Sequence, residues 1–106
     1  MATGRLGSSA LAAGTLTTVY TCPADTFAVV AVNFLNRGNA MQAFRLAIAD
    51  AATPLNGEYI EYDVEVNPKG VLERTGLVLS AAQKIVAYAS GSTASCVVYG
   101  IETSTL

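Results

Sequence analysis

Histidine and tryptophan are both absent from this 106-residue chain, and cysteine occurs only twice. Histidine is the commonest general base in enzymes and the commonest metal ligand, so its absence removes the usual group that activates a serine or cysteine nucleophile. The sequence also lacks a Gly-x-Ser-x-Gly motif and a glycine-rich phosphate loop. We therefore predict that the chain is not an enzyme and that it uses no cofactor and no metal ion.

Charged residues are scarce as well, at 13% of the chain against about a quarter of a typical soluble domain. The net charge is only −2, and the six basic residues are scattered, so the sequence offers no basic patch for nucleic acid. No apolar stretch reaches membrane-spanning length, and Gly7-Ser8-Ser9 stands where a signal peptide needs its apolar core. We expect neither nucleic acid nor a membrane as a partner.

Hydrophobic residues, in contrast, make up 52% of the sequence. A chain of this length has a thin core to fill, so the surplus predicts apolar surface that is buried in an assembly. The two cysteines, Cys22 and Cys96, lie within β-type runs, and we expect no secretion signal. We expect both to be free, buried thiols in a reducing compartment.

Short runs rich in β-branched and aromatic residues alternate with turn signals such as Asn36-Arg37-Gly38-Asn39 and Asn67-Pro68-Lys69-Gly70. This spacing predicts an all-β fold, an antiparallel β-sandwich or jelly roll of about seven or eight strands. Residues 1–14 are rich in Gly, Ser and Ala and show no clean period, so we expect a flexible N-terminal arm. Residues 15–106 are expected to form a single β-sandwich domain.

One strand, residues 27–35, is apolar on both of its faces. Successive side chains of a strand point to opposite sides of the sheet, so this strand needs cover on both sides. Cover could come from the chain's own arm or from a neighbouring subunit, and we expect the neighbour. Val30→Asp or Val32→Asp is then expected to impair folding or assembly. The candidate interface residues are Val30, Val32 and Phe34 in the strand, Leu6 and Leu11 in the arm, and Tyr59.

Residues 59–66 alternate most clearly, with Ile60, Tyr62, Val64 and Val66 expected inward and Glu61, Asp63 and Glu65 outward. We interpret the acidic residues as a solvated sheet face; pairing with Arg45 or Arg74, or calcium binding with further oxygen ligands, are the alternatives. Tyr59 shares the outward face and is the best candidate for an exposed aromatic. A sugar-binding platform around it is a lesser alternative.

Several segments carry a likeness to a known family. They are Gly4-Arg5-Leu6-Gly7, Thr18 to Ala24, Asn33, Asn36-Arg37, Arg45 to Asp50, Glu58 to Asp63, Gly70 to Gly76, Gln83 to Val86 and Val98 to Glu102. In these residues the sequence resembles a family of short virion structural proteins of tailed bacteriophages, especially those that infect cyanobacteria. The resemblance covers nearly the whole chain and concerns its pattern of strands and turns, not any chemistry.

The resemblance implies a non-enzymatic component of the virion, assembled in the host cytoplasm. The expected role is a capsid decoration (cement) protein, present as a homotrimer, that clamps neighbouring major capsid subunits. A neck, baseplate or tail-fibre component is the alternative. Similar sequences commonly have glycine where this chain has Asp25 and Ala82. If those turns require a positive φ, Ala82 is strained there, whereas Asp25 tolerates it.

Overall fold

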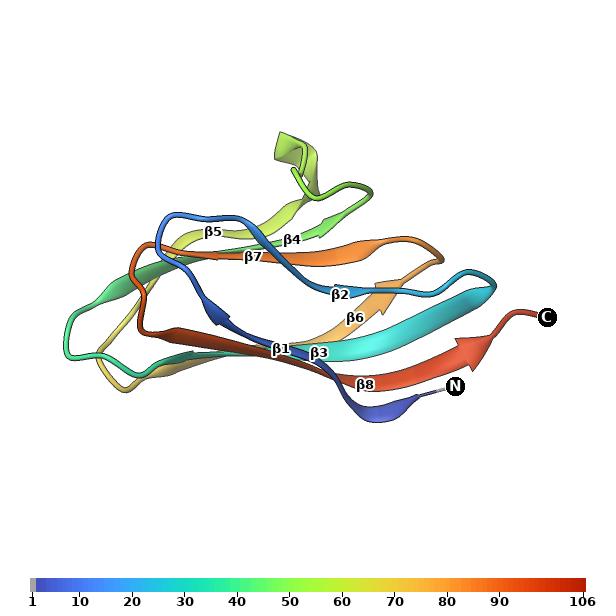
Figure 1. Ribbon diagram of the computed structural model, residues 1–106, viewed down its shortest axis with the longest axis horizontal. Helices are drawn as coiled ribbons and strands as arrows, with labels where there is room; N and C mark the ends of the chain where they lie inside the picture. Colours follow the sequence, from blue (N-terminus) through green and yellow to red (C-terminus); the bar gives the residue numbers. More distant parts are fainter. Residues whose placement is uncertain (1) are drawn as a thin grey trace.

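The computed structural model describes residues 2–106, and two four-stranded antiparallel sheets pack face to face in it (Figure 1). Sheet A has the strand order β1-β8-β3-β6, and sheet B has the order β2-β7-β4-β5. The elements are β1 (Thr3–Leu11), β2 (Thr17–Thr21), β3 (Thr26–Asn36), β4 (Gln42–Ala49), the short 3-10 helix η1 (Asn56–Glu58), β5 (Tyr59–Val66), β6 (Val71–Leu79), β7 (Lys84–Ala89) and β8 (Ala94–Ser104).

Every connection except β4 to β5 passes from one sheet to the other. Eight strands connected in this way form a jelly roll, which confirms the predicted all-β sandwich. The part of the chain that the structure describes contains no helix with the length and apolar character needed to cross a bilayer.

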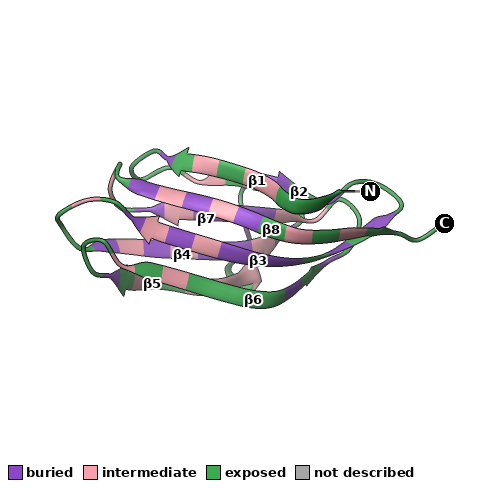
Figure 2. Ribbon diagram, turned by 90° about the horizontal axis from the view of Figure 1, so that it is seen from below, coloured by how far each residue is buried: buried purple, intermediate pink, exposed green. Residues whose placement is uncertain are grey.

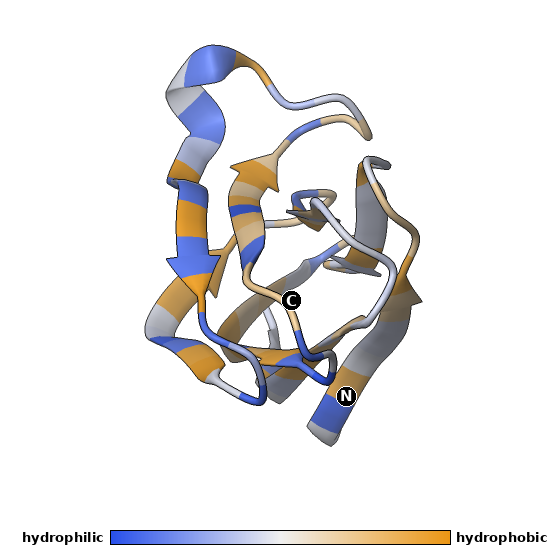
Figure 3. Cartoon of the chain, turned by 90° about the vertical axis from the view of Figure 1, so that its left-hand side faces the viewer, coloured by the Kyte–Doolittle hydropathy of each residue, from blue (hydrophilic) through white to orange (hydrophobic). Residues whose placement is uncertain are grey.

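The core lies between the sheets and consists of the side chains that point inward from each strand. In β3, Val30, Val32 and Phe34 point inward and are buried, and Phe34 stacks on Phe44 of β4 with ring centroids 4.7 Å apart. Figure 2 shows buried residues alternating with less buried ones along β8 of sheet A, and Figure 3 shows apolar and polar residues alternating along β5, the strand that follows η1. This period of two is the strand pattern that the sequence predicted.

The expected flexible arm is wrong for residues 3–11, which form the edge strand β1. It pairs with β8 from Thr3 opposite Ile101 to Leu11 opposite Ala94. Backbone pairing with β8 holds β1 in place, and small side chains let β1 lie close to β2. A Cβ added to Gly7 would lie 2.3 Å from the carbonyl oxygen of Val19 in β2. The sequence shows no clean period here because a register shift between Arg5 and Gly7 breaks the alternation.

The expected alternation of β5 is also wrong in part. Two register shifts interrupt the pairing of β5 with β4, and Asp63 has a φ of 55°. The bulged strand turns Tyr62 to the outside, where 57% of it is exposed, although the pattern predicted it inward. Ile60, by contrast, packs against the core as expected.

The two turns that the sequence singled out, at Asp25 and Ala82, both have a positive φ, 55° and 69°. Ser80 to Gln83 is a turn closed by a hydrogen bond from Gln83 N to Ser80 O, 3.1 Å long, with Ala82 as its third residue. A positive φ at this position but not at Ala81 is the pattern of a type II turn, where glycine is preferred at the third residue. The expectation that Ala82 is strained is confirmed.

Candidate interaction surface

The outer face of sheet A is apolar along the middle of the sheet. Val29 of β3 lies opposite Val78 of β6 on one side and Ile101 of β8 on the other, and directly opposite residues share one face. Phe27 precedes Val29 on the same face by strand alternation. Their exposed fractions are 38% for Phe27, 36% for Val29, 47% for Ile101 and 59% for Val78.

Tyr99 and Val71 continue this surface along the strands, and both are exposed. Tyr99 is opposite the small Ala31, and its hydroxyl donates a 2.5 Å hydrogen bond to Oε2 of Glu73. The hydrogen bond to this carboxylate raises the pKa of Tyr99 above its ordinary value. We call Phe27, Val29, Val71, Val78, Tyr99 and Ile101 the apolar face. These six are most of the large hydrophobic residues that the described chain exposes.

Sheet B differs because its outer surface is partly covered by its own chain. Ala47, Ala49 and Val86 form a second, smaller cluster there, against which Leu16 and Tyr59 pack. The β4–β5 connection, which contains η1, stands out beyond these strands in Figure 1. The chain thus covers part of the outer side of sheet B with its own residues, while the apolar face of sheet A is open.

None of the six predicted interface residues belongs to the apolar face. Val30, Val32, Phe34 and Leu11 are buried in the core, Leu6 is half-buried against that core, and Tyr59 is half-buried on sheet B. The sequence correctly identified a strand with two apolar faces, but the residues of that strand chosen for an interface face the chain's own core. The even-numbered residues of β3 face sheet B, and the odd-numbered residues face outward.

The sequence reasoning named none of the six residues of the apolar face as interface residues, Val29, Val78 and Ile101 among them. A signal existed in two other runs, Leu77-Val78-Leu79 and Val97 to Ile101, which are also apolar on both faces. Three such strands that are neighbours in one sheet must share an apolar outer surface. The order of strands within the sheets was needed to bring them together.

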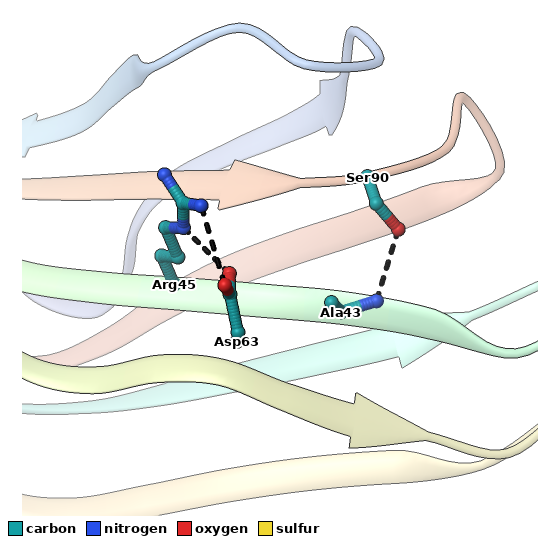
Figure 4. Close-up of polar contacts among 4 residues, drawn as sticks. All are labelled: Ala43, Arg45, Asp63 and Ser90. Atoms are coloured by element: carbon teal, nitrogen blue, oxygen red, sulfur yellow. Dashed lines mark hydrogen bonds and ion pairs between the residues drawn. The ribbon is translucent and has the colours of Figure 1, made fainter.

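The acidic residues of β5 pair with arginines of the same chain, one of the alternatives left open above. Arg45 Nε donates to Asp63 Oδ1 at 2.6 Å (Figure 4), and Arg74 Nη1 lies 3.3 Å from Glu61 Oε2. The first pair joins β4 to β5 within sheet B. The second joins β6 to β5 and so connects the two sheets at one edge.

Arg45 also lies between two tyrosines on the outside of sheet B. Its Cζ is 4.2 Å from the ring centroid of Tyr62 and 4.4 Å from that of Tyr88, both within the range of cation–π contacts. Tyr62 meets Tyr59 edge to face, with centroids 5.1 Å apart. These contacts give sheet B a polar and aromatic outer surface, in contrast to the apolar face of sheet A.

The two cysteines are free and buried, as expected. Burial raises the pKa of the Cys96 thiol to about 12 and raises that of Cys22 as well. Burial and a 2.5 Å hydrogen bond to Glu102 likewise raise the pKa of Tyr20. Both thiols are therefore protonated near neutral pH and behave as small core residues.

Residues 2–106 form no enclosed pocket and no group of three or more side chains that could hold a metal ion. The open feature of this part of the chain is the apolar face. Among known proteins, no family model matches the chain, and no curated protein sequence matches it.

Proposed function

We propose that this chain is a non-enzymatic structural protein of a virus particle, and that it serves as a capsid decoration protein that clamps neighbouring major capsid subunits. The resemblance to short virion proteins of tailed phages is the reason for proposing a bacteriophage particle. The apolar face of sheet A is the observation that carries the assembly role. Exposed contiguous apolar surface on a small domain is typical of a protein–protein interface.

The construction of the domain supports this role. Two sheets share a core centred on stacked Phe34 and Phe44, so the outer surfaces are held on a stiff block. Asn36 and the Arg74–Glu61 pair fix the sheets to each other at one end and at one edge. A rigid face loses little conformational entropy when it docks, and many copies on one particle strengthen weak individual contacts.

The copy number in purified particles tests the proposal. Quantitative mass spectrometry of the virion measures this chain against the major shell protein. A decoration protein is present in near-stoichiometric amounts. A ratio far below that indicates the neck, baseplate or tail fibre and contradicts the decoration role, and absence from the particle contradicts the virion role altogether.

A second candidate function, carbohydrate binding, is favoured by one observation on sheet B. Tyr62 is largely exposed and is flanked by Arg45 and Asp63, so a ring face and hydrogen-bonding groups lie side by side. Such a combination suits a sugar ring. Binding on a glycan array that Tyr62→Ala abolishes would support this candidate, and an array without signal would exclude it.

A further inference from the structure

We propose that the apolar face of sheet A packs against the same face of a second copy of this chain, about a two-fold axis that runs parallel to the strands. The inference rests on the proposed function, in which this face is an assembly surface, and it names the partner. Three features of the face carry it: its size, the register of its apolar side chains, and its two charged residues.

The size of the face suits a stable pair. In Figure 1 the sheets are seen edge-on with their strands along the longest axis, so the molecule's extents along its longest and shortest axes, 46 and 19 Å, bound the face of sheet A. These bounds leave room for the roughly 800 Å² that each partner buries in a standard interface. Phe27, Val29, Val78 and Ile101 lie together within this area, where the dry centre of an interface would be.

The apolar side chains are arranged so that two copies can pack in register. An axis parallel to the strands places β8 of one copy over β3 of the other at the same level along the strands. Ile101 and Val29 are opposite each other in the β8–β3 pairing, so each Ile101 would lie over Val29 of the second copy. Side chains of two packed sheets contact each other in this way in sandwich cores. Tyr99 reaches across β3 of its own chain to Glu73 and covers Ala31, so it adds a ring face to the same surface.

The charges select this axis over the alternative. Arg5 lies on the outward side of β1, opposite Tyr99, and Glu73 lies outward on β6, opposite Asn33; these strands form the two edges of sheet A. The axis parallel to the strands brings β1 over β6 of the second copy. Arg5 and Glu73 are then two residues apart along the strand direction, because Arg5 is level with Ala31 and Glu73 with Asn33. This separation is roughly 7 Å, a distance that an arginine side chain can span.

A two-fold axis across the strands would instead place β1 over β1 and bring the two Arg5 side chains to the same edge. Arg5 makes none of the ion pairs found within residues 2–106, so its guanidinium is available to a second copy. Opposite charges at facing edges set the orientation of an interface and penalise the reversed arrangement.

The oligomeric state of the purified chain tests the inference. Light scattering after size exclusion, together with sedimentation equilibrium, should give a dimer at about 0.1 mM. Val29→Asp should weaken the dimer at least a hundred-fold, because it buries an unpaired carboxylate in the centre of the interface. Leu55→Asp is the matched control: it makes the same change at a 71% exposed residue in the β4–β5 connection and should leave the dimer intact. Thermal melts check that both variants fold.

A charge exchange tests the orientation. Arg5→Glu and Glu73→Arg should each weaken the dimer about ten-fold or more, and the double variant should recover most of the loss. Wild-type chain that stays monomeric, a trimer, or two single variants whose effects simply add in the double variant would overturn the inference. If the wild type is monomeric but Val29→Asp is lost from particles, the proposed function stands with another protein on this face. If the dimer forms but the chain is absent from particles, the inference stands and the proposed function fails.

Discussion

Asn36 Nδ2 donates a 3.1 Å hydrogen bond to the carbonyl oxygen of Val66, which ties the end of β3 in sheet A to the end of β5 in sheet B. The same amide also donates to Ala40 O at 2.8 Å and to Asn67 O at 3.3 Å, and its Oδ1 accepts from Gly38 N at 3.0 Å. One fully buried side chain thus satisfies backbone groups from two turns.

Asn36→Ala should destabilise the fold by about 2–4 kcal/mol, because it leaves buried carbonyl groups without a donor. Asn36→Asp should be at least as damaging near neutral pH, since a carboxylate would then face three carbonyl oxygens. Chemical denaturation measures both. Asn39→Ala, an exposed position of the same turn, is the control and should change stability by less than about 0.5 kcal/mol. A loss below about 1 kcal/mol for Asn36→Ala would contradict this role.

Ala82→Gly should stabilise the protein by about 0.5–1 kcal/mol. Ala82 has a φ of 69°, which costs a residue with a Cβ about 1–2 kcal/mol, and the greater freedom of glycine in the unfolded chain takes back part of the gain. Ala81→Gly, one position earlier in the turn, lacks this relief and should be neutral or destabilising. Thermal melts of the two variants provide the comparison, and a lower melting temperature for Ala82→Gly would refute the strain.

Gly7→Ala should destabilise the fold by about 1–3 kcal/mol, because its Cβ would lie 2.3 Å from the carbonyl oxygen of Val19 and force β1 away from β2. Gly57→Ala meets no atom within 4 Å and is the control. Both are measured by urea denaturation. Equal stability of the two variants would show that residues 3–11 behave as the flexible arm first expected from the sequence.

Stability should fall as the pH rises from about 9 to 12. The pKa of Cys96 is raised from 9.0 to about 12 in the fold, so the unfolded chain releases a proton that the folded chain keeps. The stabilisation is complete below pH 9 and is lost as the pH approaches 12, with a slope of up to about 1.4 kcal/mol per pH unit from this group. Cys96→Ala should reduce the slope, and the remainder comes from Cys22, Tyr20 and Tyr99, whose pKa values are also raised in the fold. Val98→Ala, a buried substitution without a titrating group, should lower stability and keep the slope. Parallel profiles for the wild type and Cys96→Ala would contradict the assignment.

The fold class followed from sequence because turn signals and apolar runs are local features. The register was harder. The bulge at Asp63 reversed the expected side of Tyr62, and the shift between Arg5 and Gly7 hid a strand within a segment of small residues. A single inserted residue moves every following side chain to the other face, and nothing in the local composition marks it.

The interaction surface depended on a different kind of information. The sequence could say that residues 27–35 have two apolar faces, but not which face points to sheet B. That choice follows from the pairing of β3 with β6 and β8, which are distant in the chain. Because Val29 lies between the exposed Val78 and Ile101, the odd-numbered residues of β3 form its outward, exposed side. Val30→Asp and Val32→Asp consequently test folding, and Val29→Asp tests assembly.

Incorporation of Val29→Asp into virus particles is the most direct test of the claim that the apolar face is an assembly surface. The measurement is the amount of this chain relative to the major shell protein in purified particles, for the wild type, Val29→Asp and Leu55→Asp. The account predicts wild-type amounts of Leu55→Asp and a strong loss of Val29→Asp from the particle, although both purified variants are folded. Wild-type amounts of folded Val29→Asp in normal particles would contradict it.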